Sequence, residues 1–204
     1  MSVRKAVASL FPFVRGRNQK REFPDSFSGL GTVMTWDIVG FSRALEGMSA
    51  EELASGLGNV VSVYGRSIEE SSGQILQNMG DGGLALWLPS ETSHALLAFR
   101  CGASICRRLS QAKPPDSRPH VRIALGTGSV AGGLSMGRRH IVGVACITAK
   151  RLQELDLPRR TSMLYTSETL PFVEGETPRT APVAQITRTT GEVLEVYEYR
   201  DNGS

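Results

Sequence analysis

The sequence predicts an α/β (α+β) domain in which helices flank a central, mostly antiparallel sheet. Short apolar runs that end at Asp or Gly alternate with longer stretches whose apolar residues recur at helical spacing. In chain order these segments give the pattern β-α-β-β-α-β, with further elements after it. This order is typical of ferredoxin-like α/β sandwiches. The 204 residues allow one such domain and an appendage, but hardly two complete domains.

The first strand and the first helix are expected between residues 32 and 73. Residues 32–36 form a short apolar run that ends at Asp37, and Gly40 favours a turn directly after it. Helical spacing then begins and ends near Gly73. The residues that recur at this spacing are Leu53, Leu57, Val60, Val61, Tyr64 and Ile68. The first acidic candidate, Asp37, therefore lies at a strand end.

A hairpin and a second helix are expected next. The apolar runs 74–79 and 84–88 are joined by residues 80–83, whose sequence Gly-Asp-Gly-Gly is typical of a hairpin turn. The second acidic candidate, Asp81, lies in that turn. A helix is expected from about residue 92 to residue 109, because the proline pair that follows would end any continuation.

The remaining chain predicts strands around one more helix. Residues 120–130 are typical of a strand, and the glycine-rich segment 126–137 indicates a second, looser hairpin arm where backbone can approach a ligand closely. Residues 143–155 have the pattern of a helix. A further strand is expected at 161–167 and a hairpin at 183–199.

Composition and charge exclude some classes of function. The 23 basic and 20 acidic residues leave a net charge of +3, which is too small for a general nucleic-acid binder. No apolar stretch is long enough to span a membrane, because Arg100 interrupts the best candidate, residues 94–109. Cys101, Cys106 and Cys146 form neither a metal-type pair nor an even disulfide set, so we expect reduced thiols in the cytoplasm.

The uneven charge lies at the front of the chain. Residues 1–29 are expected to form a basic arm, because the basic side chains of residues 1–23 are opposed by Glu22 alone. The arm could pack on the domain or on a partner subunit, remain a flexible tail, or dock on a membrane surface or another protein. The main domain is then expected at 30–200, with a short tail at 201–204.

Asp37 and Asp81 are the acidic residues best suited to chemistry. They end strands that could lie side by side, and two such carboxylates can share divalent metal ions. Mg²⁺ combines a few carboxylates with substrate phosphate oxygens, so the pair would suit a nucleoside triphosphate. Alternatively, each Asp is only a turn residue, and Arg122 and Arg151 are ordinary surface charges. The sequence contains no phosphate-binding loop, zinc pattern or serine nucleophile motif.

Four segments together resemble the successive motifs of class III nucleotide cyclases. They are 36–42 (Trp-Asp-Ile-Val-Gly-Phe-Ser), 78–82 (Asn-Met-Gly-Asp-Gly), 121–128 (Val-Arg-Ile-Ala-Leu-Gly-Thr-Gly) and 143–152. They follow the family's order and spacing over about residues 30–199. The resemblance implies a catalytic domain that converts a nucleoside triphosphate into the 3′,5′-cyclic monophosphate and pyrophosphate.

The resemblance also implies roles for single residues. Asp37 and Asp81, with the backbone at Ile38, would hold two divalent ions, Mg²⁺ or Mn²⁺. Arg151 matches the arginine that stabilises the transition state, and in this family it would face the Asp pair of the partner in a twofold homodimer. The residues that would bind phosphate are Val39, Gly40, Phe41, Arg122 and either Arg188 or its neighbour Thr189.

The expected base pocket departs from the family's purine-binding pattern. Adenylate cyclases usually have a lysine at the position of Gln77, an Asp or Thr at that of His140, and an asparagine at that of Ile147. The guanine-reading Glu and Cys are missing as well. A pyrimidine would leave space for a bulky side chain, and Tyr64 is the candidate unless it is an ordinary core tyrosine.

A smaller branch of the family, the bacterial pyrimidine cyclases of anti-phage defence, consists of short stand-alone chains, and this chain is similar in that we expect one catalytic domain without an attached regulator. We therefore expect UTP as the preferred substrate and cyclic UMP as a second messenger, read by a separate effector. The alternatives are a purine cyclase with an unusual pocket, an inactive copy, and a silent nucleotide-binding or dimerisation module. Pyrophosphate release from mixed triphosphates would separate an enzyme from a silent module.

Overall fold

The structure, a computed structural model, describes most of the chain. The described residues are 24–39, 49–78, 80–89, 93–111, 120–135, 137–158, 160–176 and 180–201. Three expectations fall wholly or partly elsewhere: residues 1–23 of the basic arm, the phosphate-binding residues Gly40 and Phe41, and residues 202–204 of the tail lie outside the described residues.

Eight strands of the described residues form one sheet, in the order β2-β3-β1-β4-β6-β8-β7, with β5 paired to β4 beyond this row. Neighbouring strands are antiparallel except β4 and β6, which are parallel. The strands are β1 (Ser26–Ile38), β2 (Gln74–Asn78), β3 (Gly82–Trp87), β4 (Val121–Ser135), β5 (Arg138–Val142), β6 (Ser162–Thr166), β7 (Ala184–Thr187) and β8 (Val193–Tyr199). The helices are α3 (Ala50–Glu70), α4 (His94–Gln111), α5 (Val144–Gln153) and the short 3-10 helix η2 (Leu170–Phe172).

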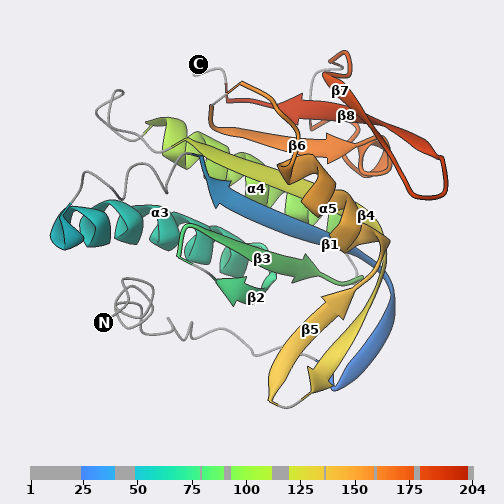
Figure 1. Ribbon diagram of the computed structural model, residues 1–204, viewed down its shortest axis with the longest axis horizontal. Coiled ribbons are helices and arrows are strands. Elements are labelled where there is room, and N and C mark those ends of the chain that lie inside the picture. Colours follow the sequence, from blue (N-terminus) through green and yellow to red (C-terminus); the bar gives the residue numbers. More distant parts are fainter. Residues whose placement is uncertain are drawn as a thin grey trace.

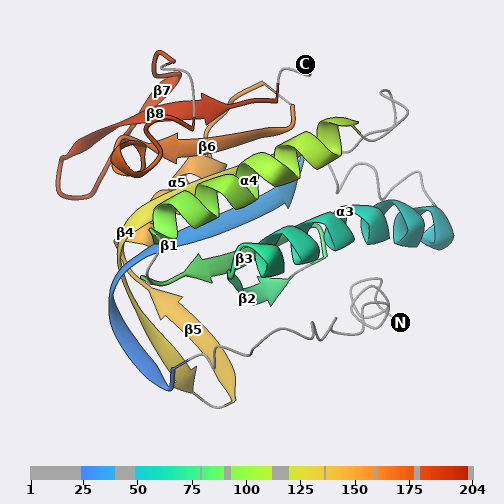
Figure 2. The ribbon, with the colours of Figure 1, turned by 180° about the vertical axis from the view of Figure 1, so that it is seen from behind.

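Helices cover both faces of the sheet. Figure 1 shows α5 in front of β4, and Figure 2, the view from behind, shows α3 and α4 together on the opposite face. The larger core cluster lies under α3 and α4 and includes Trp36 of β1 and Phe99 of α4. A smaller cluster, with Val33 of β1 and Ala149 of α5, lies on the other face. Side chains alternate along a strand, so neighbouring residues of β1 contribute to different clusters.

The predicted order β-α-β-β-α-β is confirmed by β1, α3, β2, β3, α4 and β4. Most of the apolar stripe of the first helix is also confirmed where it is described, since Leu57, Val60, Tyr64 and Ile68 are buried. Val61 is half-buried. None of the helices in the described part of the chain is long and apolar enough to cross a membrane.

Two strands are longer than the sequence predicts. The first strand, expected at 32–36, begins at Ser26, because residues 26–31 also pair with β4. The glycine-rich segment 126–137, expected as a looser hairpin arm, does form a hairpin with β5, but its residues 126–135 are a regular continuation of β4 that pairs with β1 as far as Gly133. Long pairing between β1 and β4 therefore extends the sheet into the arm that carries β5 (Figure 1).

The glycines of β4 allow close packing of backbone. A Cβ atom at Gly126 would lie 2.1 Å from the carbonyl oxygen of Ala145 and 2.7 Å from the nitrogen of Ala149, both in α5. Only glycine therefore lets α5 sit this close to β4. The sequence suggested that this segment approaches a ligand, whereas at Gly126 it approaches a helix.

A buried polar network joins β1, β4 and α4. Thr32 shares hydrogen bonds with His94 at 2.8 Å and with Thr127 at 3.0 Å. Thr127 in turn shares one with Thr169 at 2.9 Å. All four side chains are buried, and burial lowers the pKa of His94 below its ordinary value. Burial thus favours an uncharged His94.

Candidate active site

Asp37 and Asp81 lie at the same end of the sheet. Asp37 pairs in register with Gly82, the first residue of β3. Asp81 directly precedes Gly82, and its carbonyl oxygen accepts a hydrogen bond of 3.0 Å from the N–H of Ile38. A Cβ atom at position 82 would lie 2.8 Å from the carbonyl oxygen of Trp36, so glycine allows the two strand ends to approach. The strands that carry the two carboxylates are therefore neighbours, as expected.

The Asp37 carboxylate is on the α5 face of the sheet. Trp36 packs in the cluster under α3 and α4, whereas the hydroxyl of Thr35 donates a hydrogen bond of 3.5 Å to the carbonyl of Ala149 in α5. Because side chains alternate, Asp37 shares the face of Thr35. Asp37 is exposed and Asp81 is half-buried, so a ligand can reach both carboxylates.

The two carboxylates influence each other electrostatically. Partial burial raises the pKa of the Asp37 carboxyl above its usual value, and the negative charge of Asp81 raises it further. The positive charge of Arg122 and a hydrogen bond from the backbone of Ile38 lower the same pKa. Each negative charge disfavours ionisation of the other carboxyl, and a cation bound between the two carboxylates would relieve this repulsion.

The donor set at this strand end suits a hard divalent cation. Carboxylate and backbone carbonyl oxygens are the ligands that Mg²⁺ prefers, and Mg²⁺ is commonly held by one or two carboxylates together with substrate phosphates. The described residues contain no larger group of His, Cys, Asp or Glu suited to a metal ion. A cation at Asp37 and Asp81 would therefore need oxygens from a ligand to complete its coordination.

The backbone after β1 is partly occupied by internal hydrogen bonds. The N–H of Val39 donates to the carbonyl of His120 at 2.8 Å, and that of Ile38 donates to Asp81. The Val39 amide was expected to hold phosphate, and this bond would have to break first. The other two expected amides, of Gly40 and Phe41, lie outside the described residues.

Arg122 lies beside Asp37 and is fixed by three carbonyl groups. Its position in β4 pairs in register with Asp37. Its Nη1 donates to the carbonyls of Gln153 at 3.2 Å and Leu155 at 2.7 Å, and its Nη2 donates to that of Leu157 at 3.0 Å. A guanidinium has five N–H groups, so these bonds leave two for a ligand.

Arg151 and Arg188 lie near the other edge of the sheet. Arg151 donates to the carbonyl of Thr187, the last residue of β7, which β4, β6 and β8 separate from β1. Arg188 follows Thr187 and forms ion pairs with Glu168 and with Glu192, the latter at 2.6 Å. One protomer therefore does not bring these two arginines to the Asp pair.

Gln77 reaches the face of Asp37 because of an irregularity in β2. The register of β2 against β3 shifts between Ile75 and Gln77, and Gln77 pairs with Leu84. Leu84 packs against the cluster on the α5 face. Since paired residues share a face, the exposed Gln77 lies on the same face as Asp37.

The other two exposed candidates for the base pocket are His140, which is not adjacent to Gln77, and Ile147. His140 in β5 pairs with Gly133, which pairs with Ser26 at the start of β1, far along the strand from Asp37. Ile147 is 53% exposed on α5. The described residues of one protomer therefore form no closed base pocket.

Tyr64 lies in the core on the opposite face. Its ring stacks on Trp36 with centroids 5.1 Å apart, and only 2% of the residue is exposed. Burial raises the pKa of its hydroxyl, which has no hydrogen-bond partner among the described residues. The structure does not bring Tyr64 to Gln77. Its burial matches the alternative of a core tyrosine, except that such a tyrosine is expected to have a partner for its hydroxyl.

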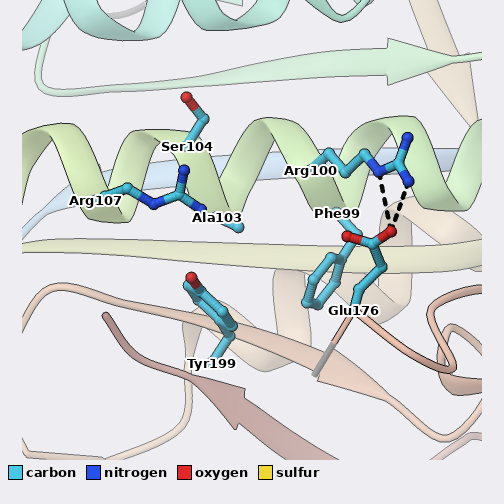
Figure 3. Close-up of a pocket in the computed structure, with 7 residues that line it drawn as sticks. All are labelled: Phe99, Arg100, Ala103, Ser104, Arg107, Glu176 and Tyr199. Atoms are coloured by element: carbon cyan, nitrogen blue, oxygen red, sulfur yellow. Dashed lines mark hydrogen bonds and ion pairs between the residues drawn. The ribbon is translucent and has the colours of Figure 1, made fainter. Parts of the chain in front are cut away.

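A shallow cavity of about 220 Å³ lies elsewhere, beside α4. Figure 3 shows Arg100 at one end, held by the carboxylate of Glu176, with Tyr199 and Arg107 toward the other end. Because α4 covers the face opposite to Asp37, this cavity is not part of the candidate site.

Sequence reasoning identified the arginines but not their partners. Gln153, whose side-chain Nε2 donates to the carbonyl of Arg122 at 3.1 Å, carries no motif that would single it out. Glu168 belongs to a segment with no expected role. Glu192 faces Arg188 across the turn of the expected β7–β8 hairpin, and opposite charges across a hairpin could have indicated that pair.

Comparison with known proteins places this geometry in a familiar fold. The chain matches no protein-family model. In sequence it is 29% identical over 145 residues to adenylate cyclase 1 of Rhizobium meliloti, a match that covers 65% of this chain. The chain spans only 22% of the length of that relative.

Solved structures match over most of the chain. The catalytic core of a rhodopsin-guanylyl cyclase with converted specificity, in complex with ATPαS, aligns with a TM-score of 0.72 at 19% identity, over 87% of this chain and 99% of the other. The adenylyl cyclase CyaB from P. aeruginosa aligns with a TM-score of 0.70 at 18% identity, over 87% and 97%. The eight-stranded sheet and its flanking helices are therefore the class III cyclase fold.

Proposed function

We propose that this chain is a nucleotide cyclase that converts a nucleoside triphosphate into its 3′,5′-cyclic monophosphate and pyrophosphate. The observation that carries the proposal is the pair Asp37 and Asp81 at adjacent strand ends, with Arg122 on the next strand, in a class III cyclase fold. In the reaction the ribose 3′ oxygen bonds to the α-phosphorus and loses its proton. The bond from that phosphorus to the bridging oxygen breaks, and pyrophosphate leaves.

Asp37, Asp81 and the backbone at Ile38 would hold two divalent ions, Mg²⁺ or Mn²⁺. When bound, such ions lower the pKa of the 3′-hydroxyl and neutralise phosphate charge. Arg122 has two N–H groups that its carbonyl partners leave unused, and they suit the triphosphate oxygens. Because three other bonds already fix this guanidinium, little ordering is needed when substrate binds.

The site would be completed by a second copy of the chain. Arg151 is the proposed transition-state residue, yet within one protomer it lies toward β7, away from the Asp pair. A twofold homodimer with shared sites would let Arg151 of each protomer serve the other. Exposed apolar side chains support such a contact, since Val142 is 66% exposed, Ile147 53% and Leu134 51%, all on α5 or the β4–β5 arm.

UTP is the proposed preferred substrate. Gln77 supplies a neutral amide on the face of Asp37, which can both donate and accept hydrogen bonds to the O4 and N3–H edge of uracil. His140 would join this pocket only if the dimer brings it there. The rival is a purine cyclase, which the similarity to an adenylate cyclase favours.

The experiment is a product assay with the purified chain. ATP, GTP, CTP and UTP at equal concentration are incubated with Mn²⁺, and the products are separated by chromatography. We expect cyclic UMP to be the main product. If cyclic AMP or cyclic GMP is the main product instead, the proposed base preference is wrong and the proposed cyclase activity is supported. The absence of any cyclic product and of pyrophosphate would support the silent module instead.

Matched variants test the metal pair. Asp37→Asn and Asp81→Asn should each abolish turnover and leave the fold intact, because the carboxylates are accessible and contribute little to core packing. Asp25→Asn, at an exposed Asp just before β1, is the control and should retain activity. Turnover in a folded Asp37→Asn protein would contradict the metal assignment.

A role of cyclic UMP as a second messenger in anti-phage defence would follow from the pyrimidine proposal. It rests on the resemblance to the pyrimidine cyclases of anti-phage defence and on the altered base pocket. Its test is the cyclic UMP content of cells that carry the chain, before and after phage infection. A rise that Asp37→Asn abolishes would support it, and unchanged content would contradict it.

A further inference from the structure

Hydrogen bonds between Arg122 of β4 and Gln153 of α5 join the end of the helix to the strand, and each side chain donates to the other residue's backbone. Arg122 of β4 donates through its guanidinium to the carbonyls of Gln153, Leu155 and Leu157, at 3.2, 2.7 and 3.0 Å. Gln153 returns a hydrogen bond of 3.1 Å from its side-chain Nε2 to the backbone carbonyl of Arg122. The chain that leaves α5 therefore wraps around one guanidinium.

One of the guanidinium bonds satisfies a carbonyl of the last helical turn, that of Gln153, and the other two fix the segment that follows the helix. The carbonyl of Leu155 also accepts a hydrogen bond of 3.0 Å from the N–H of Leu157. The carbonyl groups of the last helical turn have no partner within the helix. A charged donor such as a guanidinium forms a stronger hydrogen bond with them than a neutral donor does. Leu155 and Leu157 also pack against the cluster between α5 and the β6–β8 side of the sheet. The end of α5 is thus fixed relative to the strand that lies beside Asp37.

Arg151 belongs to the same turn, two residues before Gln153. Its side chain donates to the carbonyl of Thr187 in β7. The turn that carries Arg151 is therefore held to β4 by the Gln153 side chain and by the Arg122 guanidinium, and to β7 by Arg151 itself. Loss of the Gln153 bond leaves the Arg122 bonds in place, so we expect a small shift of the turn. A shift of about 1 Å in a catalytic group can lower a rate by roughly 100-fold.

We propose that Gln153 is a positioning residue, which holds the last turn of α5 on β4 and thereby places Arg151 for the reaction in the partner's site. This inference rests on the proposed cyclase function. Gln153 touches no substrate group in the proposal and acts only through the helix turn. A role through Arg122, in its own protomer's site, is the competing outcome of the test.

Gln153→Met is the informative variant because it keeps the length of the side chain and removes its polar atoms. The variant loses the hydrogen bond to Arg122, but it also removes Oε1, a buried oxygen with no partner among the described residues. Its unfolding temperature should therefore change little. A residue with only a structural role would lower stability without a selective effect on turnover.

The first measurement separates kcat from KM. We expect Gln153→Met to lower kcat by roughly 10-fold to 100-fold, with KM for the triphosphate changed less than the rate, because Arg151 is proposed to act in the transition state. Glu154→Gln is the control: this neighbouring side chain is exposed and lies 3.9 Å from Lys150 in a surface ion pair. Equal kcat in Gln153→Met and wild type would overturn the inference.

The second measurement asks which site Gln153 serves. In a dimer of one Asp37→Asn chain and one Gln153→Met chain, one site combines an intact Asp pair with the Arg151 of the chain whose Gln153 is intact. We expect that site to be active, so mixing the two weak variants restores turnover. Failure to restore it, despite demonstrated subunit exchange, would show that Gln153 acts in its own protomer's site and would overturn the proposal.

The two proposals fail in different ways. If the wild-type chain produces no cyclic nucleotide, the proposed function fails and the inference fails with it. If the wild type is active and Asp37→Asn is inactive, the function stands, and the Gln153→Met results decide the inference alone.

Discussion

Gly126→Ala tests how α5 is seated on the sheet. The added Cβ would lie 2.1 Å from the carbonyl oxygen of Ala145 and 2.7 Å from the nitrogen of Ala149. Both contacts are with helix backbone, so no side chain can rotate away to make room. The helix must move off β4, or the strand must bend, and either change disturbs the packing of Ala145 and Ala149 against Val33.

The size of the effect follows from the cost of overpacking a core, about 2 kcal/mol for one methyl group in a tight site. For a chain of this length that corresponds to a fall of roughly 4–8 °C in the unfolding temperature. Gly65→Ala is the matched control. No atom lies within 4 Å of a Cβ atom there, and Gly65 is inside α3. Alanine favours a helix interior, so we expect a gain of about 0.5–1 kcal/mol.

Thermal and urea unfolding of both variants give the comparison. The reasoning predicts opposite signs for the same chemical change. If Gly126→Ala unfolds at or above the wild-type temperature, α5 does not approach β4 as closely as the structure has it, and the positioning of Arg151 by this helix would need another basis.

Three further predictions concern the dimer, a buried histidine and the base. Mixing Asp37→Asn with Arg151→Ala chains should restore about a quarter of wild-type turnover, since half of the dimers are mixed and each has one intact site; no recovery after verified subunit exchange would place Arg151 elsewhere. Burial lowers the pKa of His94 in the folded state, so the unfolded state binds a proton more readily. The contribution of neutral His94 to the free energy of unfolding is therefore complete above about pH 6.5 and is lost as the pH falls through the folded-state pKa. His94→Asn should flatten the decline of unfolding temperature between about pH 7 and pH 5, and an unchanged slope would exclude His94 as its source. Gln77→Lys, which introduces the residue usual in adenylate cyclases, should raise ATP turnover relative to UTP; an unchanged product ratio would remove Gln77 from base recognition.

The order of elements was predictable because it depends on local pattern. Helical spacing from Leu57 to Ile68 and the glycine-rich hairpin signal at 80–83 both act within a few residues, and the structure has a helix and a hairpin there. The turn is shorter than predicted, because β3 begins at Gly82 and not at residue 84. The lengths of β1 and β4 were not predictable, since their extension depends on pairing between segments about 100 residues apart. The glycine-rich residues beyond the predicted strand at 120–130 give no alternating pattern that would indicate its continuation to Ser135.

The candidate site was predictable only in part. The motif positions of Asp37 and Asp81 correctly indicated neighbouring strand ends. The contacts of Arg122 and Arg151 were not predictable, because their acceptors are backbone carbonyls. Every residue has such a group, and the path of residues 153–157 decides which carbonyls meet Arg122. The type of residue at a position therefore does not indicate whether its carbonyl makes such a contact.

Gln77 illustrates a different limit. In a regular strand, side chains alternate, and Gln77 would share the face of Ile75, which packs against the core under α3 and α4. The register shift between Ile75 and Gln77 inserts one extra residue and moves Gln77 to the face of Leu84 and Asp37. The spacing of four residues between Gln77 and Asp81 is the same in either case. The extra residue in β2, and not that spacing, is what leaves Gln77 available to a ligand held at Asp37.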